Sequence, residues 1–235
     1  MEPICPASDS WHVWQDIDRK AAVNMAIDEQ LFHLSATIEC PIVRTYGWTE
    51  KAVTIGYFQP ITVIPPDIPV WCRRMSGGGV VDHRQDLTFS LSVPRSHDLY
   101  QVDRFESYRL INACIASAMG ELGLDCWLAS EEAQVEDRAQ LVCFESPARF
   151  DVVCTKGKVC GGAQRRSAKG MLLQGSLQWH LTGHAKACVA TYLIAGLRSL
   201  LGYQFQEWAP NQGFYEDVEK LVQSRYANSE WNCKR

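Results

Sequence analysis

The sequence predicts an α+β fold with a mixed sheet, and three observations support this class. Of the 235 residues, 46% are hydrophobic, which is enough to bury one sizeable core. Apolar residues recur at helical spacing in some segments and alternate, or run together, in others. These segments follow one another as a helix, strands, a helix, more strands and two final helices, which is not a regular βαβ series. Because no linker or internal repeat divides the sequence, we expect residues 1–235 to form a single domain.

The first predicted element is a helix over residues 21–34, where apolar residues recur every three or four positions. Asp16 and Asp18 precede it as possible N-terminal caps. Segments 41–48 and 51–58 are short and rich in β-branched and aromatic residues, and turn-compatible residues separate them. We therefore predict that these two segments form a hairpin.

The middle of the chain contains a loop, a strand and a helix. Two prolines and an aspartate at 65–67 break the chain into a loop. Residues 87–93 alternate apolar with small polar residues, which is typical of a half-buried strand. Residues 105–122 have helical spacing, and Gly123 stands where a left-handed C-terminal cap is expected.

The last part of the chain is predicted to contain strands followed by helices. Residues 130–140 are polar and acidic and predict an exposed loop. Residues 150–181 predict two or three strands joined by short polar turns. Residues 186–201 and 214–227 are amphipathic and predict two further helices.

The charge balance narrows the classes of partner. The formal net charge of −4 at pH 7 gives no overall positive field, so we expect neither a nucleic acid nor an anionic membrane as partner. The first residues, MEPICPASDSWHVWQ, have neither the basic nor the apolar segment of a secretory leader. No run approaches the ~18 apolar residues of a membrane span. We therefore expect a cytoplasmic protein.

The ten cysteines are expected to be free thiols, because no secretion signal accompanies them and the core is large enough to need no disulfides. No CxxC pair occurs, and the six histidines are scattered along the chain. We therefore expect no metal site. Most of the cysteines are expected to pack as small buried hydrophobic residues.

A glycine-rich segment, RRMSGGGVVDH at residues 73–83, is the first candidate for a binding site. Glycines let backbone N–H groups approach a ligand closely, and arginines offer a fixed fork to a phosphate or a carboxylate. The segment lacks the GK[ST] ending of a Walker loop and the GxGxxG of a dinucleotide-binding fold. The alternative is a glycine-rich hairpin with arginines on the surface.

The second candidate is the segment KVCGGAQ at residues 158–164. A lysine before small residues on a strand could point its ammonium into a cleft; the alternative is a solvated turn lysine, which is the commoner case. A catalytic cysteine would need such a cation and partial exposure, because the thiolate is the nucleophile. Sequence context alone does not distinguish Cys143 from the other cysteines as that nucleophile.

Seven short motifs together carry a resemblance to a known superfamily. They occur in the order NMAID (24–28), RTYGW (44–48), IGYFQ (55–59), RRMSGGG (73–79), DLTFS (86–90), KVCGGAQ (158–164) and QGS (174–176). This set resembles the lipoate/biotin protein ligase catalytic domain and covers most of the chain. Within it, CFESPARFD at 143–151 is similar to the cysteine-dependent octanoyltransferases, which use octanoyl-acyl carrier protein. The separation of Cys143 and Lys158 also matches that group.

The resemblance implies a fold and a reaction. The fold is a single catalytic domain with a mixed, mainly antiparallel central sheet, a small second sheet and helices packed on one side. Cys143 would take an octanoyl or lipoyl group from acyl carrier protein and pass it to a lysine of a lipoyl domain or of the glycine-cleavage H protein. Lys158 would lower the pKa of the Cys143 thiol and polarise the acyl carbonyl, with backbone donors for the oxyanion. No cofactor is implied.

The resemblance also implies the residues of the substrate site. Cys143 and Lys158 would be catalytic, and Arg165, Arg166 and Lys169 would offer a docking surface for the carrier protein. The residues expected to bind substrate are Arg73, Arg74, Ser76, Gly77, Gly78, Gly79, His83, Gly161, Gly162, Ala163, Gln164, Gly175 and Ser176.

One departure and several alternative functions accompany the resemblance. Many relatives carry a histidine just before the glycine of the last motif, where this chain has Leu173 and Gln174. An ATP-dependent lipoate ligase would use ATP and Mg²⁺, would form a lipoyl-adenylate held by the glycine loop and Lys158, and would not need the cysteine. An amidotransferase between lipoyl proteins would use the same cysteine. A non-catalytic binder of lipoylated proteins would use the fold alone.

Overall fold

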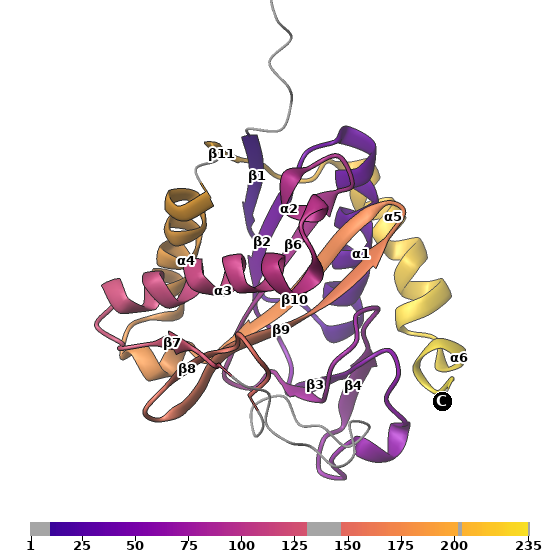
Figure 1. Cartoon of the computed structure of the whole chain (residues 1–235). Coiled ribbons are helices and arrows are strands. Elements are labelled where there is room, and N and C mark those ends of the chain that lie inside the picture. The colour runs from indigo at the N-terminus through magenta and orange to yellow at the C-terminus, as the bar shows by residue number, and fades with distance from the viewer. Residues whose placement is uncertain (1–9, 131–146, 202–203, 235) are drawn as a thin grey trace, which may run out of the picture.

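The computed structural model describes residues 10–130, 147–201 and 204–234 (Figure 1). Its main sheet has eight strands in the order β11-β1-β2-β6-β10-β9-β8-β7. β1 runs parallel to both of its neighbours, and the other pairs are antiparallel. The strands are β1 (Ser10–Gln15), β2 (Ile42–Tyr46), β6 (Leu87–Pro94), β7 (Trp127–Leu128), β8 (Val152–Cys154), β9 (Gly157–Ser167), β10 (Gly170–Leu177) and β11 (Gln204–Glu207). This confirms the predicted mixed, mainly antiparallel sheet and the strands between 150 and 181.

A second, smaller sheet has three strands in the order β4-β3-β5: β4 (Val70–Arg73), β3 (Ala52–Ile55) and β5 (Val81–Asp82). The predicted hairpin of segments 41–48 and 51–58 is wrong, because β2 belongs to the main sheet and β3 to the small one. Each strand has a long-range partner instead: β2 pairs with β6, and β3 pairs with β4 and β5. The chain leaves the main sheet at Trp48, whose indole N–H donates to the Thr88 hydroxyl.

The predicted helices are all present. The structure has α1 (Ala21–Ile38), α2 (Asp98–Gln101), α3 (Arg104–Glu121), α4 (Lys186–Leu201), α5 (Gln212–Leu221) and α6 (Ser229–Asn232), with 3₁₀ turns η2 (Ile61–Val63) and η4 (Trp179–Thr182) and a π-helical turn η5 (Val222–Tyr226). Asp103 caps α3, and Gly123 beyond its end has φ +81° as predicted. The predicted caps of α1 are wrong, because Lys20 occupies the N-cap and Asp16 pairs with arginines instead.

Helices cover both faces of the main sheet because β6 alternates two kinds of side chain. On one face its apolar residues pack under α3 and α4; these are Leu87, Phe89, Leu91 and Val93. On the other face the Ser90 hydroxyl donates to Asp28 of α1. The strand predicted to be half-buried is therefore buried on both faces. The helices expected on one side divide, with α3 and α4 together on one face and α1 and α5 on the other (Figure 1).

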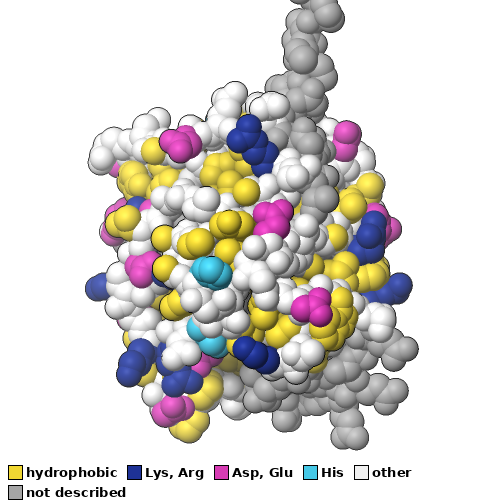
Figure 2. Space-filling model, turned by 90° about the vertical axis from the view of Figure 1, so that its left-hand side faces the viewer, with side chains coloured by type: hydrophobic (Ala, Val, Ile, Leu, Met, Phe, Trp, Pro, Cys, Tyr) yellow, Lys and Arg dark blue, Asp and Glu magenta, His cyan; other side chains and the backbone are white. Residues whose placement is uncertain are grey.

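The outer surface mixes charged and apolar side chains. Figure 2 shows the side of the molecule on which α4 and β7 lie, where hydrophobic patches alternate with acidic and basic side chains. Among the helices of the described residues, none has the length and apolar character needed to cross a membrane.

Candidate functional site

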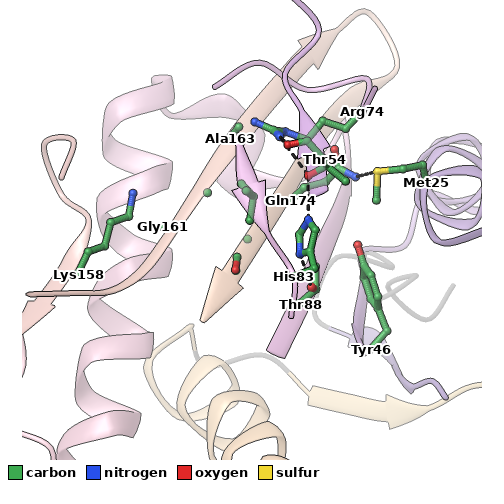
Figure 3. A pocket seen from close by; sticks show the side chains of 14 residues that line it. Met25, Tyr46, Thr54, Arg74, His83, Thr88, Lys158, Gly161, Ala163 and Gln174 are labelled. Atoms are coloured by element: carbon green, nitrogen blue, oxygen red, sulfur yellow. Dashed lines mark hydrogen bonds between the residues drawn. The ribbon is translucent and has the colours of Figure 1, made fainter. Parts of the chain in front are cut away.

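A pocket of about 420 Å³, including the space at its open mouth, lies between the two sheets and beside α1 (Figure 3). Fourteen residues line it: Met25, Tyr46, Thr54, Arg74, Val81, His83, Thr88, Lys158, Gly161, Gly162, Ala163, Gln174, Gly175 and Ser176. Eight of these were expected from the sequence, drawn from the glycine loop, β9 and β10. The fold thus brings three separated motifs to one pocket.

Six of the expected residues lie around the pocket rather than on its wall: Arg73, Ser76, Gly77, Gly78, Gly79 and Gln164. Arg73 is fully buried, and its guanidinium donates to three main-chain carbonyls between Gly56 and Gln59. The Gln164 amide exchanges hydrogen bonds with Ser107 on α3. These residues therefore shape the surroundings of the pocket.

The Arg74 guanidinium bridges two carbonyl groups of the glycine loop. Its Nη2 donates to the carbonyl oxygens of Gly77 (2.6 Å) and Gly79 (2.7 Å). Gly78 between them has φ +84°, and a Cβ there would lie 3.0 Å from Arg74 Nη2 and 3.3 Å from the Cβ of Ala163. The alternative of a hairpin with surface arginines is wrong, because β4 and β5 flank β3 and Arg74 is only 4% exposed.

Lys158 is buried and lines the pocket. Its Nζ lies 2.7 Å from Oδ2 of Asp151, and the two side chains are 5% and 1% exposed. Gly161 leaves the space for this ammonium, since a Cβ there would lie 2.5 Å from Nζ. The alternative of a solvated turn lysine at position 158 is therefore wrong, whereas Lys156, in the turn before β9, is exposed.

Asp151 and Tyr108 complete this side of the site, and sequence reasoning missed both as functional residues. The Tyr108 hydroxyl donates to Oδ1 of Asp151 (2.6 Å) and accepts from the N–H of Gly162 (2.7 Å). Burial, followed by the nearby Asp151 charge, raises the pKa of Tyr108 well above its ordinary value. The acidic residue that ends the CFESPARFD motif was the available signal for Asp151.

His83 lies on the opposite side of the pocket between two hydrogen-bonding partners. Its Nδ1 is 2.8 Å from Asp86 Oδ2, and its Nε2 is 2.8 Å from the Thr54 hydroxyl. That hydroxyl also accepts from Arg74. Trp48 stacks on the imidazole with ring centroids 3.9 Å apart. The position and the orientation of the ring are thus both held.

Gln174 occupies the position near which many relatives carry a histidine, and it links α1 to the glycine loop. Its Nε2 donates to Asp28 Oδ2 (2.8 Å), and its Oε1 accepts from the Ser76 hydroxyl (2.7 Å). Tyr46 and Arg44 donate to the same Asp28 carboxylate. An amide can donate and accept at the same time, so Gln174 satisfies both the Asp28 carboxylate and the Ser76 hydroxyl.

The cysteines separate into two groups. Cys143, the expected nucleophile, lies outside the described residues, as does most of the predicted loop 130–140. Cys154 and Cys160 are buried in the core, as predicted. Burial raises the pKa of the Cys160 thiol far above its ordinary value, so this thiol is a packing group.

No group of three or more histidine, cysteine, aspartate or glutamate side chains converges as a metal site within residues 10–130, 147–201 and 204–234. His180 and His184 are four residues apart, a spacing that can bind a metal when both lie on one helix. Here the 3₁₀ turn Trp179–Thr182 ends at Gly183, which has φ +75°. The two histidines therefore do not share a helical face.

Two of the three basic residues expected to form a docking surface are half-buried and donate to main-chain carbonyls. Arg166 donates to the carbonyl oxygens of Tyr100 and Val102, and burial lowers the pKa of its guanidinium. Arg165 donates to the Met75 carbonyl. Of the three, Lys169 is the one in an exposed turn.

Comparison with known proteins places this site in a family. The model of the lipoyl protein ligase A/B catalytic domain matches residues 20–189, a range that includes every residue lining the pocket. The chain belongs to this family. Octanoyltransferase LipM of Anoxybacillus flavithermus is 36% identical, over 95% of this chain and 99% of that protein. Octanoyltransferase LipM of Halalkalibacterium halodurans is 34% identical, over 71% of this chain and 64% of that protein.

Solved structures agree with the fold. A lipoate-protein ligase A bound with ATP has a TM-score of 0.78 at 21% identity, covering 95% of this chain and 98% of that one. A bi-partite lipoate protein ligase from Thermoplasma acidophilum has a TM-score of 0.72 at 19% identity, covering 95% and 96%. The family and fold predictions are confirmed, and the curated relatives confirm the prediction of an enzyme of the acyltransferase class.

Proposed function

We propose that the protein transfers an octanoyl, or lipoyl, group from acyl carrier protein to the lysine of a lipoyl domain or of the glycine-cleavage H protein, through a thioester on Cys143. The observation that carries the proposal is the buried Lys158 ammonium at a pocket walled by Gly161, Gly162 and Gly175. A cation beside a glycine-walled cavity is what a thiolate and an acyl chain require. Relatives named as octanoyltransferases, 27–36% identical over nearly the whole chain, support it.

The reaction proceeds in two acyl transfers. The Cys143 thiolate attacks the carbonyl carbon of the donor thioester; a new C–S bond forms, and the bond to the carrier thiol breaks. The carrier leaves as a thiolate and takes up the proton that the Cys143 thiol gave up. The neutral amine of the acceptor lysine then attacks the acyl-enzyme, forming an amide and releasing Cys143 as a thiol. Lys158 favours the thiolate and donates to the oxyanion in both steps.

The structure revises the choice of oxyanion donor. The N–H of Gly162, one of the expected backbone donors, is already given to the Tyr108 hydroxyl at 2.7 Å. The Lys158 ammonium is therefore our proposed donor. On the neighbouring strand, Gly175 pairs with Gly162, and a Cβ on Gly175 would overlap the ring of Phe89. These two glycines let β9, β10 and the Phe89 ring pack closely beside the pocket.

The contacts of the two arginines favour the transferase over an ATP-dependent ligase. An adenylate site needs cations directed at phosphate oxygens. Here Arg73 and Arg74 donate to main-chain carbonyls of the loops around the pocket. The proposed reaction accordingly uses neither ATP nor Mg²⁺.

Incubation with octanoyl-acyl carrier protein tests the proposal. We expect a hydroxylamine-labile acyl adduct on Cys143 by peptide mass spectrometry, and Cys143→Ser should abolish transfer to a lipoyl domain. ATP-dependent modification from free lipoate, with Cys143 unmodified, would instead establish the ligase. A donor requirement for an acylated lipoyl protein would establish the amidotransferase. Binding of a lipoyl domain without any transfer would establish the binder.

A further inference from the structure

We propose that Asp151 is a positioning residue that keeps Lys158 charged and aimed into the pocket, and that Tyr108 orients Asp151. This inference rests on the proposed function, in which Lys158 acts as a cation. It concerns residues on α3, at the start of β8 and on β9, all of which the structure describes.

Both oxygens of the Asp151 carboxylate accept hydrogen bonds. Oδ2 accepts from Lys158 Nζ (2.7 Å) and from the main-chain N–H of Ala148 (2.6 Å), and Oδ1 accepts from the Tyr108 hydroxyl (2.6 Å). A carboxylate that is 1% exposed requires such partners, because burying an unpaired charge is costly. Ala148 follows Cys143 by five positions in the sequence. One carboxylate thus fixes both the ammonium and the main chain at Ala148.

Lys158 and this carboxylate form a buried ion pair. Burial disfavours a charged ammonium, and a nearby carboxylate restores the preference for the protonated form. The other titratable groups that act on this neighbourhood in the described residues include Tyr108 from α3, Cys160 from β9, Cys126 before β7 and Asp86 before β6. The raised pKa values of Tyr108 and Cys160 keep both groups neutral at physiological pH. Asp151 is therefore the counter-ion in hydrogen-bond contact with Lys158.

Side chains of helix α3 hold Asp151 and the residue before it in place. The Tyr108 hydroxyl donates to Oδ1 of Asp151. It also accepts a hydrogen bond from the N–H of Gly162, on the strand that carries Lys158, and this second bond fixes its position. One turn further along α3, the Asn112 amide donates to the carbonyl of Phe150 (2.9 Å). Phe150 has φ +70°, an unusual conformation that sets the direction of the chain into Asp151.

Asp151→Asn is the decisive variant, because asparagine keeps the size and one acceptor oxygen but removes the charge. We expect kcat for transfer from octanoyl-acyl carrier protein to a lipoyl domain to fall about tenfold or more. The alkaline limb of the pH profile should move to lower pH, because a buried ammonium without its counter-ion loses its proton more easily. KM for the acceptor should stay within about twofold. Asp217→Asn is the matched control, because Asp217 pairs with Lys220 at 2.8 Å on the surface; it should leave both quantities unchanged.

The outcomes separate this inference from the proposed function. If wild-type protein forms no acyl adduct on Cys143, the proposed function fails. The pairing of Lys158 with Asp151 is then tested by the ¹⁵N NMR signal of the Lys158 ammonium, which is assigned with Lys158→Arg. Loss of that signal in Asp151→Asn supports the inference. A wild-type pH profile or an unchanged ammonium signal in Asp151→Asn overturns it. Should circular dichroism show Asp151→Asn to be unfolded, Tyr108→Phe takes its place: a smaller shift in the same direction supports the inference, and an unchanged profile overturns it.

Discussion

The two sides of the pocket hold their polar groups in different ways (Figure 3). On one side the Lys158 ammonium pairs with the Asp151 carboxylate. On the other side several groups form a network of short hydrogen bonds, in which His83 lies between Thr54 and Asp86. A buried ion pair is sensitive to the loss of either partner, whereas a network distributes the loss. We infer that the Lys158 side supplies the chemistry and the His83 side supplies the shape.

Of the variants that test this comparison, Lys158→Ala should have the largest effect. Removal of one donor to an oxyanion typically costs 100-fold to 1,000-fold in kcat, and we expect about that loss here. The variant also leaves Asp151 buried without a counter-ion, which costs about 3–5 kcal/mol of folding free energy. Single-turnover transfer measures the first effect and urea unfolding the second. In addition, the rate at which Cys143 is alkylated should fall at neutral pH; an unchanged rate would remove Lys158 as the activating cation.

Gly175→Ala should have the next largest effect, because the Phe89 ring already occupies the space beside Gly175. The new methyl group would overlap the Phe89 ring beneath β10, so the free energy of unfolding should fall by about 1–3 kcal/mol. Gly120→Ala is the matched control, since Gly120 lies on an exposed part of α3 with nothing within 4 Å of the new Cβ. That control should be neutral or stabilise the protein by up to about 1 kcal/mol. Equal stability of the two variants in urea would contradict the assigned packing.

The two sides also differ in how far the sequence predicts them. The motifs predict the Lys158 strand and the glycine loop, because local residue types carry those signals. The partners of these elements were not predicted: Tyr108 reaches Asp151 across 43 positions, and Gln174 reaches Asp28 across 146. Local spacing holds no information about such contacts.

The same reason explains the error in the strand pairing. Segments 41–48 and 51–58 have similar compositions, and both form strands as expected. Which sheet each one joins depends on distant strands: Ile42 pairs with Ser92, whereas Val53 pairs with Trp71 and Asp82. Short separation in the sequence favoured a hairpin, but burial of β2 between β1 and β6 outweighs it.

Gln174→Leu should have the smallest effect on activity and so sharpen the contrast between the sides. It removes one of the hydrogen bonds to Asp28 and leaves the Ser76 hydroxyl without its acceptor, which we expect to cost about 1–3 kcal/mol of stability. Asp28 keeps its bonds from Arg44 and Tyr46, so the wall should hold its shape. Because Gln174 is proposed to touch no reacting atom, kcat should fall less than about tenfold while KM for the acyl donor rises. A loss in kcat as large as that of Lys158→Ala would mean that the His83 side of the pocket takes part in the chemistry.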